Sequence, residues 1–544
     1  MAGSGYLLKS TAIFDSVQDR TFSGFVAVQG NRITGTGSDE ETAGYWEEQG
    51  FEVIDCGDGL IIPGMIDAHM HFFDGIFQNS RYMCRDLFDC RSAEECVKVI
   101  GDFARKHPEY RTVTGMGWFP PGWTDSRRPD KKMLDEIEPD RPVYLMCADG
   151  HSFWLNSRAL EDCGVDPGRK LAFGEIETYE NGEANGVLHE MDACAPCSVK
   201  AQALPEETSR ELIGDFLEQL SRAGITGTTD ITVLPEPAEI TENMRIIREL
   251  ELENRLSVRL HLYPSLGMDD SFRIVEGYRQ EFQSDKFRVS GLKAFIDGVH
   301  GNHTAFLLSP YADSPGEKGS TFYPQEHYRH MVTAANRAGY GVKLHCTGEG
   351  AVHMALDAFA ASAHAKCSSG VRNSIEHVET FCEDDIDRFS KLDVTASMQP
   401  SHLMYLGNTL HVKLGPERAS RQYALKTMLD HDVNVAFSTD YPVAPFDPRL
   451  NIYFAVTRCD PEGNPVDRGS GQEITLAQAI RAYTRGSAYC LGREEELGTL
   501  EKGKLADIAV FDRDLFRRDP AEILEAEVVL TMMDGDIVYR KQGE

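Results

Sequence analysis

The stretch that decides the fold is Pro63-Gly64-Met65-Ile66-Asp67-Ala68-His69-Met70-His71. Its apolar run is typical of a buried strand, and the run ends in a His-x-His pair. Residues i and i+2 of a strand point to the same face, so the two imidazoles can bind one metal ion. Two histidines at the end of a strand are also compatible with a structural role. The rest of the chain decides between these interpretations.

The middle of the chain alternates strand-like apolar runs with helical stretches, which predicts βα units and a parallel sheet. Eight strands close a (β/α)₈ TIM barrel, and the candidates are 64–70, 226–232, 256–262, 289–296, 340–346, 373–378, 393–398 and 433–439. The gap after the first is too long for one βα unit, so 72–215 is predicted to be an insertion, with strands near 111–118 and 142–148. We expect a cap, because active sites lie at the C-terminal ends of barrel strands.

Both ends of the chain are rich in strand signals. Runs 25–28 and 32–34 flank Gly30-Asn31, and runs 528–533 and 536–539 flank Asp534-Gly535, so each pair indicates a hairpin. A further strand is predicted at 506–511. We therefore expect 1–62 and 498–544 to pair into one small β-sandwich domain, with 63–497 as the α/β barrel domain.

Composition limits the class of protein. The hydrophobic content of 41% can build a large core, and the formal net charge of −32 disfavours nucleic acid and anionic membranes as partners. The absence of a long apolar run or a secretory signal pattern predicts a cytoplasmic protein without a membrane span. The 13 cysteines are scattered, which is typical of reduced thiols. The closest pair, Cys194 and Cys197, could bind a metal or form a disulfide, but no second such pair supports a metal site.

Other predicted barrel strands also end in residues that can bind a metal. The fourth contains Lys293, the fifth ends at His345, the sixth at His377 and the eighth at Asp440. These ends meet at one barrel mouth, and imidazole and carboxylate ligands suit Zn²⁺, which lowers the pKa of a bound water to about 7. A lysine repels a metal unless CO₂ adds to its amine, in which case the carbamate could bridge two ions. The alternative is that Lys293 is a cation that binds substrate.

The residues resemble those of the amidohydrolase superfamily, a resemblance that spans nearly the whole chain. They match its binuclear ligand set strand for strand: His69, His71, Lys293, His345, His377 and Asp440. The chain is most similar to the YtcJ-like branch, amidohydrolase family 3, which includes N-substituted formamide deformylases. The marks of that branch are Gly117-Trp118, Asp149-Gly150-His151 with Trp154 and Asn156, Asn181-Gly182 to Leu188, and Met398-Gln399-Pro400.

The resemblance implies a metal-dependent amidohydrolase that cleaves an amide, N-acyl or N-formyl C–N bond of a small molecule. The first histidine pair would hold the more buried ion and the second pair the outer one, giving two Zn per chain. Carbamylated Lys293 and a hydroxide would bridge the two ions. Asp440 would bind metal, take the proton from the attacking hydroxide and pass it to the leaving amine.

Two arginines that the branch often has are missing. One position is His303, and the other lies in the segment 345–351 after the fifth strand. Two cations that could bind an anionic substrate are therefore absent, which leaves the substrate open. Candidate substrate-binding residues are His151, Trp118, Trp154, His303 and Gln399; the alternative for each is a packed or capping residue, since tryptophans are mostly core residues.

Two rival functions remain at this point. A ring or amidine deaminase would keep the fold, but such relatives usually use one metal without the lysine bridge, so Lys293 argues against it. A non-catalytic scaffold would have lost ligands, and this chain has all of them. A homodimer stays open as an assembly.

Overall fold

The structure, a computed structural model, describes residues 5–120, 123, 127–148, 150, 152–171, 174–231, 238–267, 272–365, 370–406, 409–467 and 470–542. The chain divides into two compact units. The first consists of Met1–Phe72, Gly214–Pro235 and Ile246–Glu544, and the second of Phe73–Ile213 and Glu236–Arg245. Mixed α/β structure confirms the predicted fold class at this level.

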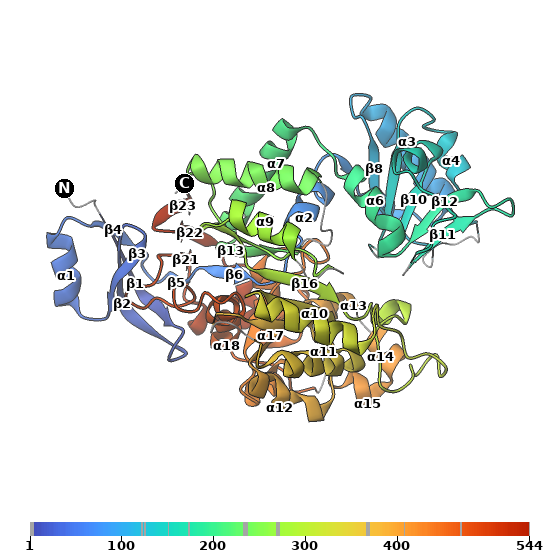
Figure 1. Ribbon diagram of the computed structural model, residues 1–544. Coiled ribbons are helices and arrows are strands. Elements are labelled where there is room, and N and C mark those ends of the chain that lie inside the picture. The colour runs from blue at the N-terminus through green and yellow to red at the C-terminus, as the bar shows by residue number, and fades with distance from the viewer. Residues whose placement is uncertain are drawn as a thin grey trace. The chain divides into compact units, whose positions relative to one another are not determined.

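In the first unit, strands from the two chain ends share one mixed sheet, in the order β23-β22-β21-β5-β1-β2-β3 with β4 beside β1. The blue and red strands of Figure 1 show this pairing. Both expected hairpins, β2–β3 and β22–β23, are present. The strands are β1 (Tyr6–Asp15), β2 (Arg20–Gln29), β3 (Arg32–Gly37), β4 (Glu52–Asp55), β5 (Leu60–Pro63), β21 (Ile508–Phe511), β22 (Val528–Met533) and β23 (Asp536–Arg540).

A sandwich was expected here, whereas hydrogen bonding joins all eight strands into one sheet. The reason is the length of β1. It pairs with β4 through Tyr6–Lys9 and with β5 through Ala12 and Ile13, so β1 joins β4 and β5 to the same sheet. Strand β5 then pairs with β21 and brings in the C-terminal strands.

The remaining strands of the first unit form two parallel sheets, in the orders β15-β14-β13-β6 and β16-β17-β18-β19-β20. Most of their residues are buried, as expected for parallel strands covered on both faces. All eight predicted strand ranges contain strands, and the fourth is interrupted at Ser290. The strands are β6 (Met65–Asp67), β13 (Ile225–Asp230), β14 (Arg259–Leu262), β15 (Phe287–Val289), β16 (Gly291–Phe295), β17 (Gly341–Cys346), β18 (Asn373–His377), β19 (Val394–Met398) and β20 (Val435–Phe437).

Backbone hydrogen bonds connect the two parallel sheets at both edges. The Ala68 N–H donates to Phe437 O (3.2 Å) beside β6 and β20. At the other edge, the Lys293 N–H donates to Pro264 O (2.9 Å), and Leu266 donates to Lys293 O (2.6 Å). Gly64 lets β6 approach β13, because a Cβ there would lie 2.2 Å from Thr226 Oγ1.

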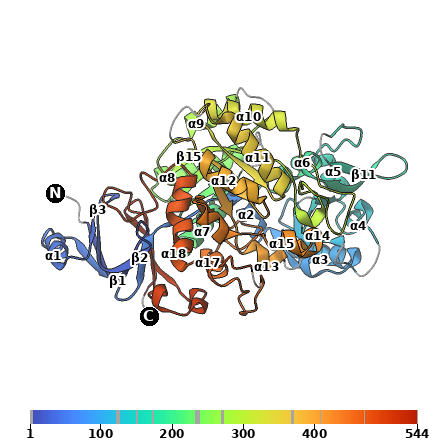
Figure 2. The same cartoon turned by 90° about the horizontal axis from the view of Figure 1, so that it is seen from below.

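Helices follow the parallel strands and pack against them. Helices α10 (Gln325–Arg337) and α11 (Glu349–Ser362) contact β17, and α12 (Glu383–Leu392) contacts β19 (Figures 1 and 2). Their sequences fix their ends locally: α18 (Leu476–Arg481) begins with a Thr475–Gln478 capping box. The other helices of this unit are α1 (Glu40–Glu48), α9 (Arg273–Glu281), α13 (His402–Leu406), α14 (Thr409–Leu414), α15 (Pro416–Ala419), α16 (Leu425–Asp430), α17 (Pro448–Thr457) and α19 (Ser487–Cys490).

The second unit has its own sheet, in the order β11-β12-β10-β9-β8-β7. The strands expected near 111–118 and 142–148 are β8 and β9. Its elements are β7 (Met83–Cys84), α3 (Ala93–Lys106), β8 (Val113–Trp118), α4 (Lys131–Asp135), β9 (Val143–Cys147), β10 (Ser152–Leu155), α5 (Ser157–Asp162), β11 (Glu175–Thr178), β12 (Ala184–His189) and α6 (Met191–Ala201). Helices α2 (Phe72–Gln78), α7 (Glu206–Arg222) and α8 (Ala238–Leu252) each span residues of both units.

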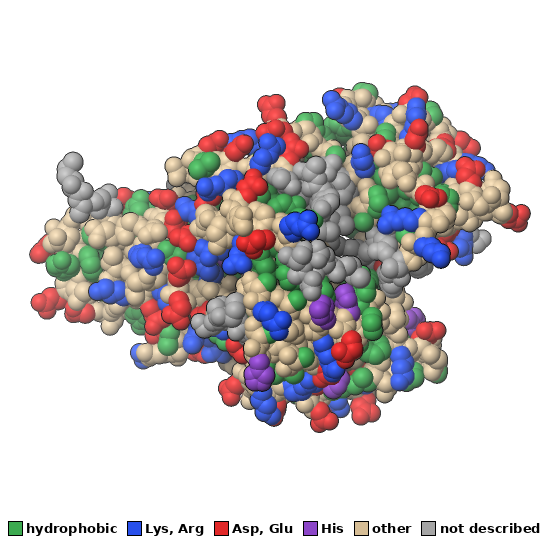
Figure 3. All heavy atoms as spheres, in the orientation of Figure 1, with side chains coloured by type: hydrophobic (Ala, Val, Ile, Leu, Met, Phe, Trp, Pro, Cys, Tyr) green, Lys and Arg blue, Asp and Glu red, His purple; other side chains and the backbone are tan. Residues whose placement is uncertain are grey.

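Among the described residues, no helix is both long and apolar enough to cross a membrane. Acidic and basic side chains are interspersed on the face drawn in Figure 3. The net charge of −32 is therefore not gathered into a single acidic patch on that face.

Candidate metal centre

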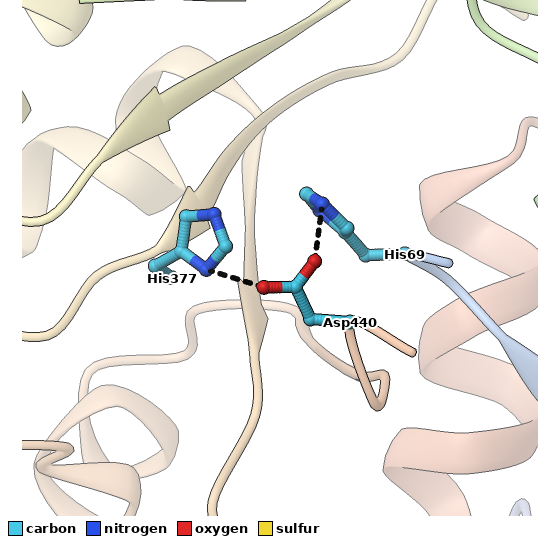
Figure 4. A group of neighbouring side chains, drawn as sticks. All are labelled: His69, His377 and Asp440. Carbon is cyan, nitrogen blue, oxygen red and sulfur yellow. Dashed lines mark ion pairs between the residues drawn. The ribbon is translucent and has the colours of Figure 1, made fainter. Parts of the chain in front are cut away.

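Three side chains from distant parts of the chain meet at the ends of the parallel strands. His69 follows β6, His377 ends β18 and Asp440 follows β20, and all three are buried. Figure 4 shows one imidazole facing each carboxylate oxygen of Asp440. The His69 Nε2–Asp440 Oδ1 distance is 3.2 Å and the His377 Nδ1–Asp440 Oδ2 distance is 3.9 Å.

His71 points its Nε2 atom at the same carboxylate oxygen, 3.3 Å from Asp440 Oδ1. Its Nδ1 lies 3.1 Å from the carbonyl oxygen of Ile231 and therefore carries the proton that it donates there. That tautomer leaves Nε2 able to accept a metal ion. The His69 and His71 rings lie 5.6 Å apart between centroids, and the Nε2 atoms of both face the same oxygen of Asp440.

The spacing of these atoms suits one ion. Two ligand atoms about 2.1 Å from Zn²⁺ at the tetrahedral angle lie about 3.4 Å apart. The two Nε2–Asp440 Oδ1 distances, 3.2 and 3.3 Å, are close to that value. Asp440 has a φ of 57°, a left-handed conformation that is uncommon for a residue with a side chain and is often found at functional sites.

His345 lies beside His377, with 4.4 Å between ring centroids. Its Nε2 donates to Gly298 O at 3.2 Å, which leaves Nδ1 as the acceptor nitrogen. Burial lowers the pKa of His345 to about 3 and that of His377 well below its usual value. Both imidazoles are therefore neutral, which is the form that binds metal.

Lys293 is buried on β16, where only 2% of its surface is exposed. Burial lowers the pKa of its amine to about 8, although the charges of Glu376 and Asp440 oppose that shift. About one-tenth of the amine is then neutral at pH 7, far more than for an ordinary lysine. A neutral amine is the form that reacts with CO₂.

The residues fit a metal centre by a second criterion. Within the part of the chain that the structure describes, three buried polar atoms at this site have no hydrogen bond: His69 Nε2, Asp440 Oδ1 and Lys293 Nζ. Buried polar atoms are nearly always paired, so unpaired ones need an explanation such as an ion. Ligand-type atoms of His69 and Asp440 that lack hydrogen bonds are what a metal site requires.

Glu376, which the sequence analysis did not assign, holds His69 in place. Its Oε2 accepts from His69 Nδ1 at 2.5 Å, so Nε2 of His69 is the nitrogen directed at Asp440. Lys343 lies 3.3 Å from Glu376 Oε1, and Ser374 donates to the same oxygen. Burial would raise the pKa of Glu376, but Lys343 and His69 hold it well below the usual value.

Backbone geometry explains how the adjacent residues Glu376 and His377 can both point toward the metal centre. Side chains of Glu376 and His377 would alternate faces in a regular strand. His377 has a φ of 75°, which ends that alternation. The signal that could have revealed Glu376 is a carboxylate in a fully buried strand, directly before a candidate ligand.

Asp67, also unassigned from sequence, joins the strand ends that carry His69 and Asp440. It accepts from the backbone N–H of His69 (3.1 Å) and from the Thr439 hydroxyl (2.6 Å). Burial raises the pKa of Asp67 to about 7. The stretch from Pro63 to His71 thus supplies two candidate ligands, His69 and His71, and also Asp67, whose hydrogen bonds hold the backbone of His69 next to Thr439.

The candidate substrate residues lie in different surroundings. Gln399 is fully buried, and its amide contacts His377 Nδ1 (2.9 Å) and donates to Ser438 Oγ (2.8 Å), so the contacts favour a role in orienting His377. His303 has a φ of 57° and contacts Asp313 (3.0 Å) and Lys413 (3.0 Å). His151 lies outside the described residues.

Trp118 and Trp154 were predicted as an apolar wall for a substrate. Both are core residues of the second unit, with 2% and 0% of their surfaces exposed. Their rings pack against each other with centroids 6.0 Å apart, and Trp118 Nε1 donates to Leu145 O at 2.8 Å. This packing favours the alternative, a structural role for both rings.

The family of the chain follows from its sequence and agrees with this site. The profile of the Amidohydrolase family matches residues 52–539. The chain belongs to this family. It is a hydrolase of the amidohydrolase superfamily, and the predicted resemblance to the YtcJ-like branch is confirmed.

Three known proteins illustrate the relationship. The putative amidohydrolase YtcJ of Bacillus subtilis is 26% identical, covering 96% of this chain and 97% of its own. The N-substituted formamide deformylase of Arthrobacter pascens is 26% identical, covering 95% of each. An uncharacterised metal-dependent hydrolase from Pyrococcus furiosus has a solved structure with a TM-score of 0.74 and 26% identity, covering 95% of this chain and 100% of that one.

Proposed function

We propose that this chain is a binuclear metal-dependent amidohydrolase that cleaves an amide, N-acyl or N-formyl C–N bond of a small molecule. The observation that carries the proposal is the convergence of His69 Nε2 and His71 Nε2 on one oxygen of Asp440, at 3.2 and 3.3 Å. Similarity to a formamide deformylase and to a metal-dependent hydrolase supports it.

The architecture that we infer for this function is a (β/α)₈ barrel with a small β domain from both chain ends and a cap insertion at 72–215. The hydrogen bonds at both edges of the two parallel sheets support closure into a barrel. In such a barrel, the C-terminal strand ends that carry the histidines and Asp440 form the catalytic mouth.

Each candidate ligand has a distinct role in the proposed site. His69 and His71 would hold one ion and His345 and His377 the other, with Lys293 between them as a carbamate. When bound, two Zn²⁺ ions would supply a water of lowered pKa and polarise the scissile carbonyl.

The chain's own residues would handle the proton. His69 and other nearby imidazoles hold the pKa of Asp440 well below its usual value despite its burial, so the carboxylate is ionised and can accept a proton. Asp440 would then deliver this proton to the leaving amine. General acid–base help of this kind contributes about 10²–10⁴-fold to rate.

A screen of the purified chain against N-acyl and N-formyl amines, with amine release as the readout, tests the proposal. We expect hydrolysis that Asp440→Ala reduces by about 10²-fold or more. His353→Ala, which alters a half-exposed histidine on α11, is the matched control and should retain activity. Release of ammonia from a ring or amidine in place of an acyl-amine cleavage would favour a deaminase.

A further inference from the structure

Two sequence motifs of the second unit play no part in the metal centre, and the structure brings the residues that follow them together. Ser152 begins β10, directly after Asp149-Gly150-His151. His189 ends β12, directly after the motif at 181–188. The two strands are antiparallel neighbours in which Ser152 lies opposite His189. Strand β11, which carries Glu177, pairs with β12 as well, so the three residues lie on adjacent strands (Figure 1).

Side chains from these strands form a continuous chain of hydrogen bonds. Ser152 Oγ lies 2.9 Å from His189 Nδ1, and His189 Nε2 lies 3.0 Å from Glu177 Oε1. Asn185 Nδ2 donates to the other carboxylate oxygen, Glu177 Oε2, at 2.8 Å. The order of the groups is therefore hydroxyl, imidazole and carboxylate, which is the arrangement that activates a serine nucleophile.

The carboxylate decides which imidazole nitrogen carries the proton. The hydrogen bonds from His189 and Asn185 lower the pKa of Glu177, although burial opposes the shift, so Glu177 is ionised and can only accept. His189 Nε2 is then the donor and His189 Nδ1 the acceptor. The Ser152 hydroxyl must donate to Nδ1, and this hydrogen bond points in the direction in which a general base removes the proton.

Helix α6 places favourable backbone dipoles next to this chain of residues. It begins at Met191, two residues after His189. The Cys194 N–H donates to Glu190 O at 2.9 Å, and the three amides before Cys194 have no acceptor within the helix. The N-terminal end of a helix favours negative charge, such as the oxyanion that forms when a serine attacks a carbonyl group.

We propose that Ser152 is the nucleophile of a second, metal-independent hydrolytic site that accepts small carboxylic esters. His189 is its general base, and Glu177 positions His189. The side chains of His189 and Glu177 are 36% and 24% exposed, so the imidazole can be reached from solvent. Ser152 beside it is 7% exposed, which leaves the hydroxyl held in place by its neighbours.

The reaction has two steps. The Ser152 oxygen attacks the ester carbonyl carbon while His189 Nδ1 takes the hydroxyl proton. The C–O bond to the alcohol then breaks, and His189 passes the proton to the departing alcohol oxygen. In the second step water attacks the acyl-serine and gives one proton to His189, the bond from the acyl carbon to Ser152 Oγ breaks, and that proton returns to the serine. One ester and one water become an acid and an alcohol.

A second serine–histidine pair, in the first unit, provides an internal comparison. Ser290 Oγ lies 2.7 Å from His261 Nδ1, but His261 is only 2% exposed. Among the residues that the structure describes, no carboxylate hydrogen-bonds to His261, so nothing fixes a proton on its other nitrogen. We therefore expect Ser290 to lack the general-base help that is worth about 10²–10⁴-fold in rate.

The experiment treats the full chain with diisopropyl fluorophosphate and maps tryptic peptides by mass. An activated serine bonds to phosphorus as fluoride leaves. Ser152 lies in peptide 133–158 and Ser290 in peptide 289–293. We expect the label on Ser152, formed about 10²-fold faster than any label on Ser290. Wild-type protein in which Ser152 remains unlabelled overturns the proposal, as does equal labelling of the two serines.

Variants test the role of each group. Ser152→Ala should abolish the label on peptide 133–158. His189→Gln, at a partly exposed position, should slow labelling by about 10²-fold or more, because the general base is lost. Ser157→Ala removes the exposed serine of the same peptide and is the control, which should be labelled like the wild type. A label that survives Ser152→Ala, or a rate that His189→Gln leaves unchanged, contradicts the assignment.

Ester hydrolysis connects the label to an activity and separates it from the metal centre. With 4-nitrophenyl acetate we expect release of nitrophenol that persists in Asp440→Ala. Adding Ser152→Ala to that variant should remove the remaining hydrolysis. Complete loss in Asp440→Ala alone would assign ester hydrolysis to the metal centre and overturn the second site.

Discussion

At the scale of single residues, the candidate centre depends on groups that do not themselves bind metal. Glu376 fixes the tautomer and orientation of His69 through a 2.5 Å contact with Nδ1. Glu376 thereby directs the remaining ring nitrogen of His69 toward the site, as carboxylates beside metal-binding histidines commonly do. Gln399 Oε1 lies 2.9 Å from His377 Nδ1, the ring nitrogen that also faces Asp440 Oδ2 at 3.9 Å.

The variant Glu376→Gln tests this role. It keeps the shape of the side chain but removes the negative charge that faces His69 and Lys343, so we expect metal affinity to fall about 10–100-fold. Competition with a chromogenic chelator measures that affinity. Glu383→Gln, at an exposed position of α12, is the control and should bind metal like the wild type. Unchanged affinity in Glu376→Gln would show that Glu376 does not position His69.

Sequence reasoning proposed the candidate ligands because the histidines and Asp440 lie at the ends of apolar strands and Lys293 lies within one, positions that can be read without coordinates. It did not find Glu376, because its partners His69 and Lys343 come from other strands, and their pairing depends on the order of those strands. It placed Gln399 at the substrate because this residue belongs to the Met398-Gln399-Pro400 motif of the YtcJ-like branch. Hydrogen bonds to His377 and Ser438 can only be seen in three dimensions.

At the scale of elements, a buried arginine ties the parallel sheet to the C-terminal strands. Arg259 on β14 makes two contacts with Asp507, at 2.8 and 2.9 Å, and a third with Asp534 at 2.9 Å. The arginine side chain is fully buried. The two carboxylates compensate its charge, so the elements that carry them are coupled energetically.

Removal of this cation should be costly. Arg259→Leu leaves Asp507 and Asp534 without their main partner, and we expect a loss of about 3–5 kcal/mol in the free energy of unfolding. Urea denaturation measures that loss. Arg255→Leu alters an exposed arginine and should change stability by less than about 0.5 kcal/mol. Equal effects of the two substitutions would contradict a structural role for the buried cluster.

The same cluster predicts a pH dependence. Arg259 and Lys286 lower the pKa of Asp534 from its ordinary 3.8, although burial opposes the shift. A carboxylate with a lowered pKa adds stability above about pH 4, and that stability is lost as the pH falls toward the folded-state value. The free energy of unfolding of Asp534→Asn should therefore fall less steeply between pH 5 and 3 than that of the wild type. Parallel curves would rule out this contribution.

Element positions in the parallel sheets could be predicted because their strands are apolar on both faces and therefore form recognisable runs. The interruption of the fourth strand at Ser290 could not, since it reflects pairing of β15 with β14 and of β16 with β17. The expected sandwich at the chain ends differed for a similar reason. Periodicity identifies strands such as β2 and β22. It does not reveal that β1 pairs with both β4 and β5 along its length.

At the scale of the whole molecule, the family match and the site indicate the same chemistry. The Amidohydrolase profile spans residues 52–539, which include every candidate ligand. The histidines, Lys293 and Asp440 are distributed from the first to the last strand of the parallel sheets, so no isolated segment can form the centre. A centre of this kind requires the full chain to bind two ions through a modified lysine.

The most direct test is the metal content per chain of zinc-loaded protein, measured by elemental analysis in the presence of bicarbonate. We expect two ions in the wild type and at least one fewer in Lys293→Ala, with two retained in the surface control Lys391→Ala. Native mass should show an added CO₂ of about 44 Da that Lys293→Ala lacks. One ion in the wild type, or two in Lys293→Ala, would contradict the lysine-bridged binuclear centre.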